Sequence, residues 1–242
     1  MVETSLKFEY EINEISEEAL PVIIVAAGNS TRMGQNKQFM EINGVPVIAR
    51  TLMAFENSRY ISKIILVTKN EDIFVMQSLC SKYGIEKICD IVGGGDSRAH
   101  SVIKGFERLS ENDNCVLIHD GARPLVTNRI IRDVADSLKI HKAVTCAVKV
   151  KDTIKTVDSS GKIVDTPDRN MLVSVQTPQG VHKAEYLNAI KAAKDISVFT
   201  DDMSVMESAG HDAYIVEGDY KNIKITTPED ISSAEAFLGE EL

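Results

Sequence analysis

The architecture of this chain can be predicted from residues 21–28, which read Pro-Val-Ile-Ile-Val-Ala-Ala-Gly. The continuous apolar run from Val22 to Ala27 is typical of a parallel strand that is covered on both faces. Small residues follow at its carboxyl end, where the backbone can approach a ligand closely. The segment therefore predicts the first strand of an open α/β sheet, with a binding loop directly after it.

The same rhythm continues as far as residue 150, where apolar runs alternate with helical patterns. The expected strands are 63–68, 87–92, 115–119 and 143–150, and the expected helices are 47–55, 71–83, 98–109 and 128–140. This alternation predicts βαβ units and a parallel sheet. Because crossovers between parallel strands are right-handed, we expect a doubly wound, mostly parallel open sheet.

Beyond residue 150 the pattern changes to shorter elements. Strand-like pieces at 152–155 and 162–165 flank Ser159-Ser160-Gly161, a turn signal, and predict a protruding β-hairpin arm over about residues 151–171. An isolated two-stranded hairpin is marginal in water, so we expect a second subunit to cover it. Later strands or helices are expected at 173–176, 183–194, 202–209, 213–216 and 222–225, before a last helix that starts at Thr227-Pro228.

Composition narrows the class of protein. Of 242 residues, 43% are hydrophobic, which suits one α/β domain over residues 21–242, preceded by an acidic N-terminal extension at 1–20. The net charge of −9 disfavours sequence-independent binding to nucleic acid.

No apolar run reaches the roughly 18–20 residues of a membrane span, and no signal peptide is recognisable. The four cysteines lack metal-finger spacing. We expect a cytoplasmic protein with neither nucleic acid nor membrane among its partners.

The loop after the first strand carries two cations, Arg32 and Lys37. A Walker A motif would need lysine directly after Gly34, where Gln35 stands, and the dinucleotide fingerprint would need glycine in place of Ser30. Two cations among small residues suit a polyphosphate that is both held and attacked. An ordinary polar loop remains the alternative for this segment alone.

Other strand ends could complete such a site. The glycines of Gly93–Asp96 could let a base lie against bare backbone, or could be a flexible turn only. Asp120 ends a strand and is placed to hold Mg²⁺ or another divalent cation against phosphate oxygens, and Arg123 could bind a second phosphate. His119 is expected to be structural. Lys224 falls in an expected apolar strand, where an unpaired cation would be unfavourable unless an anionic ligand met it.

Together these segments resemble the 2-C-methyl-D-erythritol 4-phosphate cytidylyltransferase family. The matching blocks are 26–34, 37–38, 94–102, 119–124, 151–155, 168–169, 176–179, 200–202 and 222–230. The resemblance implies transfer of a cytidylyl group from CTP to this polyol phosphate, with release of pyrophosphate, in non-mevalonate isoprenoid synthesis. It also implies a homodimer that exchanges its arms and shares its active sites. Asn36 departs from the family, in which many members have proline, and Gly121 stands where alanine is usual.

The resemblance also implies a role for each site residue. The phosphate-handling cations would be Arg32, Lys37 and Lys224. The nucleotide would be held by Ala26, Ala27, Gly28, Gly95, Asp96, Ser101 and Gly121. The metal would meet Asp120. The polyol phosphate would be held by Asp120, Arg123, Thr153 and Thr200, with Arg169 and Thr177 reaching in from the partner subunit.

Two other functions stay open. A ribitol 5-phosphate cytidylyltransferase would share the fold and the chemistry, although such enzymes typically have Val-Arg-Pro after His-Asp-Ala, where this chain has residues 121–124 as Gly-Ala-Arg-Pro. A non-catalytic nucleotide-binding module would be expected to lack the loop cations or the metal carboxylate. Arg32, Lys37, Asp120 and Lys224 are all present. A dinucleotide-dependent oxidoreductase is disfavoured because the fingerprint is missing.

Overall fold

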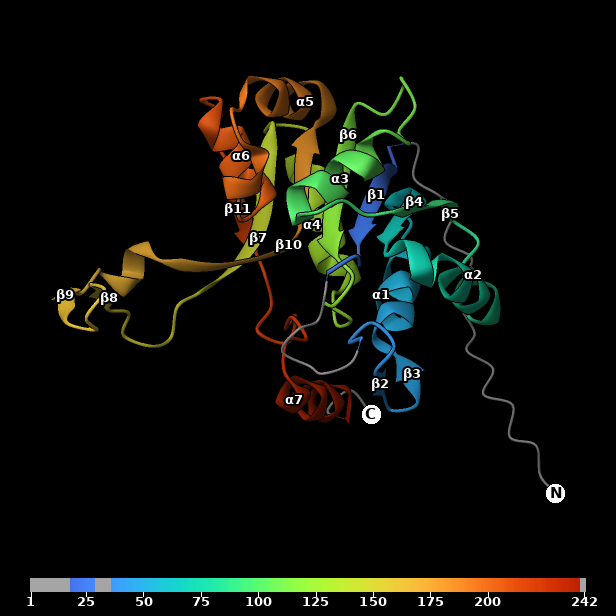
Figure 1. Ribbon diagram of the computed structural model, residues 1–242, viewed down its shortest axis with the longest axis horizontal. Helices are drawn as coiled ribbons and strands as arrows, with labels where there is room; N and C mark the ends of the chain where they lie inside the picture. The colour runs from blue at the N-terminus through green and yellow to red at the C-terminus, as the bar shows by residue number, and fades with distance from the viewer. Residues whose placement is uncertain (1–17, 29–35, 240–242) are drawn as a thin grey trace.

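A seven-stranded sheet forms the centre of the molecule in the computed structural model, which describes residues 18–28 and 36–239 (Figure 1). Its strand order is β11-β7-β10-β6-β1-β4-β5. The strands are β1 Leu20–Val25, β4 Ile61–Thr68, β5 Ile88–Gly93, β6 Cys115–Asp120, β7 Ala143–Lys149, β10 Val173–His182 and β11 Tyr214–Glu217. Only β10 runs antiparallel to its neighbours, so the predicted mostly parallel α/β sheet is confirmed.

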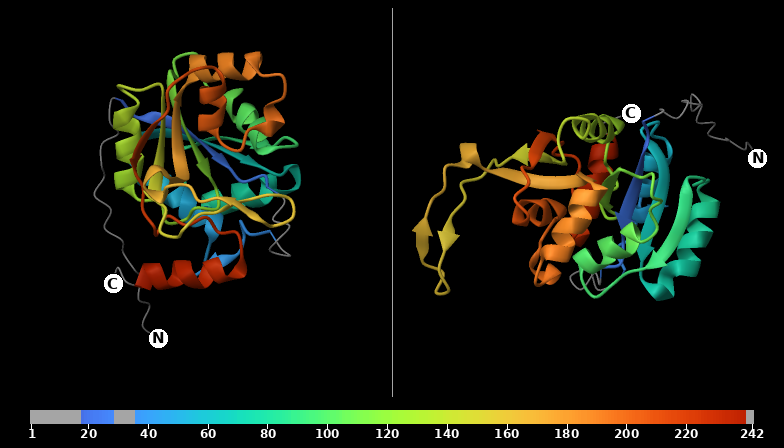
Figure 2. Two further views of the ribbon diagram at one scale, coloured as in Figure 1. Left: turned by 90° about the vertical axis from the view of Figure 1, so that its left-hand side faces the viewer. Right: turned by 90° about the horizontal axis from the view of Figure 1, so that it is seen from above.

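Helices cover both faces of this sheet (Figure 2). One face packs against α1 Val47–Glu56, α2 Ile73–Lys82 and α4 Asn128–Ser137. The other packs against α3 Arg98–Phe106, α5 Lys183–Ala192 and α6 Asp202–Ser208. Successive side chains of a strand point to opposite faces, so Val22 and Ile24 enter the first core and Ile23 enters the second. Burial on both sides is the reason that β1 is apolar throughout.

A small layer lies beyond the carboxyl ends of the strands. The strands β2 Glu41–Ile42 and β3 Val45–Pro46 form a hairpin whose turn, Asn43-Gly44, has positive φ angles of 47° and 73°. The last helix, α7 Pro228–Gly239, packs against this hairpin through a cluster that includes Ile42 and Ala234. The hairpin was not predicted, although Asn-Gly is a strong hairpin signal.

A long arm leaves the sheet between β7 and β10 and projects away from the domain (Figure 1). Its tip pairs β8 Thr156–Val157 with β9 Ile163–Asp165, and η2 Arg169–Met171 follows. The prediction of a strand at 152–155 was therefore wrong, because the ladder begins only at Thr156. Apolar side chains stand exposed on the arm, namely Val157, Ile163, Val164 and Met171.

The segment before α7 also departs from the prediction. Residues 222–225 form no strand, because their N–H groups bond to single partners: Asn222 to Asp219, Ile223 to Lys221 and Ile225 to Ala122.

The remaining short helices are η1 Asn70–Asp72 and η3 Ile196–Val198. Within the described part of the chain, none of the helices combines the length and hydrophobicity that crossing a bilayer requires.

Candidate active site

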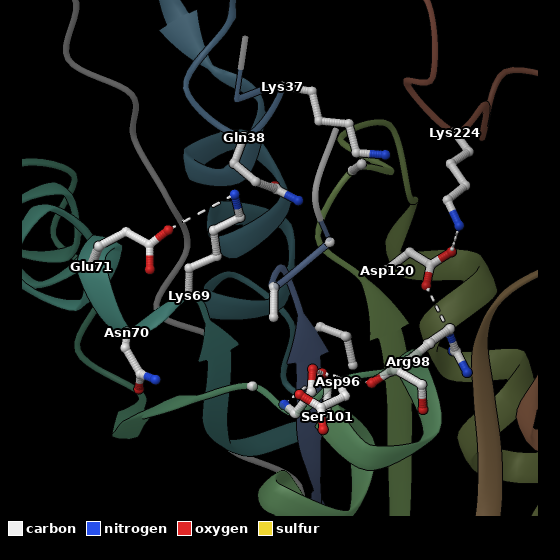
Figure 3. A pocket seen from close by; sticks show the side chains of 17 residues that line it. Lys37, Gln38, Lys69, Asn70, Glu71, Asp96, Arg98, Ser101, Asp120 and Lys224 are labelled. Carbon is white, nitrogen blue, oxygen red and sulfur yellow. Dashed lines mark hydrogen bonds and ion pairs between the residues drawn. The ribbon is translucent and has the colours of Figure 1, made fainter. Parts of the chain in front are cut away.

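A cavity of about 520 Å³ opens at the carboxyl ends of the strands. Its floor comes from three strand ends: Ala27 and Gly28 after β1, Gly94 and Gly95 after β5, and Asp120 at the end of β6. Figure 3 shows Lys37, Lys69 and Lys224 on different segments around the same opening. This confirms that the separate strand ends singled out in the sequence meet at one place.

The glycine segment is shaped by close packing. A Cβ on Gly94 would lie 2.3 Å from Cβ of Ala27, so no other residue fits there without displacement. The buried Ser101 hydroxyl accepts a hydrogen bond from the Gly95 N–H at 3.1 Å and donates one to the Ser97 carbonyl at 2.9 Å. The segment is therefore a fixed strip of bare backbone, which suits a flat base.

Asp120 lies at the centre of a cluster of cations. Its Oδ1 is 3.2 Å from Arg98 Nε and its Oδ2 is 2.7 Å from Lys224 Nζ. Arg123 Nε lies 3.9 Å from Oδ2. Burial alone would raise the pKa of Asp120, but Arg98 and Lys224 outweigh it and hold the pKa well below its usual range. The carboxylate is therefore ionised at neutral pH.

Lys224 occupies an environment different from the one predicted. It lies in the irregular segment before α7, not in a strand, and its side chain is 39% exposed. Its charge is met by Asp120, so the expected cost of an unpaired buried cation does not arise.

A second hollow of about 320 Å³ adjoins the first on the far side of Asp120. Arg123, Thr177 and Thr200 line it, and Arg98, Asp120 and Lys224 line both hollows. Arg123 donates to the Asn222 carbonyl at 2.7 Å, while its buried Nε has no hydrogen-bond partner. A buried donor that makes no hydrogen bond suits the binding of an anion. Because the two hollows share Asp120, molecules bound in them can meet there.

Thr177 and His119 support Asp120 from below. The Thr177 hydroxyl accepts from the Asp120 N–H at 3.1 Å and lies 2.9 Å from His119 Nδ1. The prediction that Thr177 reaches in from a partner subunit was therefore wrong, because it lines the hollow of its own chain. Burial lowers the pKa of His119 to about 3, and its ring packs on Phe55 with centroids 4.7 Å apart. The prediction of a structural histidine is confirmed.

The comparisons with known proteins agree with this geometry. A family model described as 2-C-methyl-D-erythritol 4-phosphate cytidylyltransferase matches residues 20–240. The chain belongs to this cytidylyltransferase family.

Relatives and solved structures of the same family cover most of the chain. A Clostridium novyi (strain NT) protein named 2-C-methyl-D-erythritol 4-phosphate cytidylyltransferase is 45% identical over 220 residues, which are 89% of this chain and 95% of that protein. A Bacillus mycoides (strain KBAB4) protein of the same name is 44% identical over 90% of this chain and 96% of its own length. The crystal structure of 4-diphosphocytidyl-2C-methyl-D-erythritol synthase from Anaerococcus prevotii aligns with a TM-score of 0.80 and 31% identity, over 92% of this chain and 99% of that one. The chain is therefore an enzyme, and the fold is that of its family.

The other predicted residues of the cytidylyltransferase site divide into several groups. The first cavity is lined by Ala27, Gly28, Lys37, Gly95, Asp96 and Ser101. Ala26 and Gly121 are buried beside its floor and are absent from the described lining. Thr153 and Arg169 lie on the arm, where Arg169 donates to the Lys151 carbonyl at 3.0 Å, and neither lines the described part of either hollow. Arg32 lies outside the described residues.

Two further parts of the candidate site, residues 69–71 and Arg98, were not predicted. Lys69, Asn70 and Glu71 form a wall of the first cavity, directly after β4. Position at the carboxyl end of a predicted strand, the criterion applied to Asp120, would have found them. Arg98 falls within the matching block 94–102 but was given no role, because both of its acidic partners are distant in the sequence.

Proposed function

We propose that this enzyme transfers the cytidylyl group of CTP to 2-C-methyl-D-erythritol 4-phosphate at Asp120. The products would be 4-diphosphocytidyl-2-C-methyl-D-erythritol and pyrophosphate, in non-mevalonate isoprenoid synthesis. The observation that carries the proposal is the pair of adjoining hollows that share Arg98, Asp120 and Lys224. Two anionic substrates need such a junction, because the reacting atoms must come within contact distance.

The nucleotide occupies the first cavity in this proposal. The base lies on the strip from Gly94 to Asp96, which Ser101 holds in place. The triphosphate then lies beside Ala27 and Gly28 and within reach of Lys37. Arg32, as a phosphate-handling cation, belongs to the same proposal.

The acceptor occupies the second hollow. Its phosphate would be held by Arg123, whose buried Nε makes no hydrogen bond, with Thr177 and Thr200 beside it. An oxygen of the acceptor's phosphate attacks the α-phosphorus of CTP and forms one P–O bond, and the bond to the β-phosphate breaks with its electron pair leaving on pyrophosphate. No covalent enzyme intermediate is needed, so the protein supplies positioning and charge stabilisation.

A divalent cation, Mg²⁺ for instance, would be held by Asp120. No three metal-binding side chains gather anywhere in residues 18–28 and 36–239, and Asp120 is the carboxylate that lines both hollows. Mg²⁺ is commonly bound by one or two carboxylates together with substrate phosphates, so this residue fits a cation that arrives with CTP. When bound, the cation would draw charge from the phosphate oxygens. Lys224, which contacts Oδ2 of Asp120, would then be released to meet a phosphate.

A homodimer with exchanged arms completes the proposal. The exposed Val157, Ile163, Val164 and Met171 would be buried against a second copy of the chain. Thr153 and Arg169 would then reach the acceptor hollow of the partner. A cytoplasmic location is also proposed, since all four cysteines are free thiols, as expected in a reducing compartment.

The substrate assignment can be tested by pyrophosphate release. The purified enzyme is mixed with CTP and Mg²⁺, and with either 2-C-methyl-D-erythritol 4-phosphate or ribitol 5-phosphate. We expect rapid release with the first acceptor and little with the second. Preference for ribitol 5-phosphate would overturn the acceptor but keep the reaction type, and no release with either would overturn the proposed activity.

A further inference from the structure

Arg98 connects two carboxylates that come from distant parts of the chain. Its Nε lies 3.2 Å from Oδ1 of Asp120, and one terminal nitrogen lies 2.8 Å from Oδ2 of Asp202. Asp120 ends β6, whereas Asp202 is the first residue of α6. Arg98 itself opens α3. One guanidinium therefore joins three elements at the junction of the two hollows.

Asp202 is held firmly and is out of reach of substrate. Its side chain is 1% exposed and is absent from the described lining of both hollows. Oδ1 accepts a hydrogen bond from the Tyr186 hydroxyl at 2.9 Å, and the Asp202 N–H donates to Gln179 Oε1 at 2.8 Å. Of the two side chains that contact the Asp202 carboxylate, Tyr186 and Arg98, Arg98 is the one that lines the hollows, so it is the direct route from this carboxylate to the site.

We propose that Asp202 is a positioning residue for the transfer reaction, acting through Arg98 on Asp120. The fixed Asp202 binds a terminal nitrogen of the guanidinium, and the neighbouring Nε of the same group holds Oδ1 of Asp120. The carboxylate then presents Oδ2 toward Lys224 and the cavity. Arginine suits this task because its planar fork binds two acceptors in fixed directions, which the single ammonium of lysine cannot do.

This inference rests on the proposed function, and it differs from a purely structural explanation. A structural ion pair between Arg98 and Asp202 would stabilise α6 and leave turnover unchanged. A positioning pair affects turnover even when the fold is intact. The two explanations therefore predict different outcomes for variants that keep the shape of Asp202.

Asp202→Asn and Tyr186→Phe test the inference at two strengths. The first removes the charge that anchors Arg98, and the second removes only the hydroxyl that holds Asp202. We expect kcat to fall about tenfold for Asp202→Asn, with KM for CTP changing by less than about threefold, because an orienting contact acts mainly on the transition state. For Tyr186→Phe we also expect a lower kcat, reduced by a smaller factor. This variant tests the inference on its own if Asp202→Asn does not fold.

Phe106→Leu is the matched control. The Phe106 ring stacks on Tyr186 with centroids 4.7 Å apart, yet it forms no hydrogen bond to Asp202. We expect this variant to lower Tm and to keep kcat. If Asp202→Asn and Tyr186→Phe also lower Tm while keeping kcat, the pair is structural and the inference is overturned.

A crystal structure of Asp202→Asn gives a second measurement that does not depend on turnover. We expect the contact between Arg98 Nε and Oδ1 of Asp120 to be lost or lengthened beyond hydrogen-bond range. An unchanged Asp120 would contradict the inference. Wild-type enzyme is assayed alongside: an inactive wild type contradicts the proposed function, whereas an active wild type with an equally active Asp202→Asn contradicts only the inference.

Discussion

Lys224 Nζ lies 2.7 Å from Oδ2 of Asp120, which joins the segment before α7 to the end of β6. The pair lies where the two hollows meet. In the proposed reaction each member would exchange its partner, because a carboxylate can bind a divalent cation and an ammonium can bind a phosphate. The chemistry proposed for this enzyme depends on that exchange.

Lys224→Ala should abolish most of the activity. The change removes one of the cations at the reacting phosphates, and loss of a single electrostatic donor typically lowers kcat by about 10²–10³-fold. The measurement is kcat by pyrophosphate release, with circular dichroism to check the fold. Lys191→Ala, on the exposed side of α5, is the control and should retain full activity. Near-normal turnover by folded Lys224→Ala would remove Lys224 from the mechanism.

Gly94→Ala should weaken nucleotide binding. The new Cβ would lie 2.3 Å from Ala27 Cβ and 2.9 Å from Ser101 Oγ, so the floor of the first cavity must shift. We expect the Kd for CTP, measured by calorimetry, to rise by about tenfold or more, since a shift of about 1 Å can cost that much. Gly239→Ala, where an added Cβ meets nothing within 4 Å, should bind CTP as the wild type does. Equal Kd values for all three proteins would contradict a base resting on this strip.

Asn36→Ala should remove the side-chain contacts that hold the backbone beside Lys37 in place. Asn36 Oδ1 accepts from the Gln38 N–H at 3.2 Å, and its Nδ2 donates to Oδ2 of Asp72 at 2.8 Å. The first bond lies within the loop, and the second ties the loop to η1. We expect kcat/KM for CTP to fall by about three- to tenfold, as for loss of one to two ordinary hydrogen bonds. Asp72→Ala removes only the second bond and should have a smaller effect. Unchanged kinetics for both would show that neither bond orients Lys37.

Stability should decrease as the pH falls below about 6.5, with His119 as one cause. Its folded pKa of about 3 lies below the ordinary value of 6.5, so the unfolded chain takes up the proton first. The contribution of His119 to stability is complete above the unfolded pKa and is lost progressively as the pH falls toward the folded pKa. Urea unfolding of His119→Gln between pH 7 and 4 should show a weaker pH dependence than the wild type. His211→Gln, a site outside the core, should behave as the wild type. If the free energy of unfolding depends on pH equally in all three proteins, His119 is not a cause of the loss of stability.

Arm exchange can be tested with mixed dimers. Lys37→Ala and Arg169→Ala are each expected to be nearly inactive. If each site takes Lys37 from one chain and Arg169 from the other, half of the sites in a mixed dimer are intact, and an equal mixture should regain about a quarter of the wild-type activity. If mass spectrometry shows that mixed dimers form and yet no activity is regained, the proposal of shared active sites is contradicted.

The sheet and the position of Asp120 were predictable for physical reasons. Burial on both faces leaves continuous apolar runs, as in β1 and β6, and the carboxyl ends of such strands meet at one edge. The glycines after β5 and the cations Lys37 and Lys224 were correctly placed at one cavity. His119 was predictable because a lone histidine lacks partners for metal binding.

Contacts between segments distant in the sequence were not predictable. The apolar alternation of Ile223 and Ile225 resembles a strand, but their N–H groups bond to Lys221 and Ala122 outside any ladder. Thr177 lies under its own Asp120 because β10 pairs with β6, a pairing that no local pattern shows. The bridge by Arg98 likewise depends on where the fold brings the two acids.

Asp120→Asn in the assay with CTP and 2-C-methyl-D-erythritol 4-phosphate is the most direct test of the proposed site. The substitution keeps the shape of the side chain and removes the charge that meets Lys224 and that would hold the proposed divalent cation. We expect the wild type to release pyrophosphate and the folded variant to be slower by about 10²-fold or more. A folded Asp120→Asn enzyme that turns over at the wild-type rate would show that the reaction does not take place at Asp120.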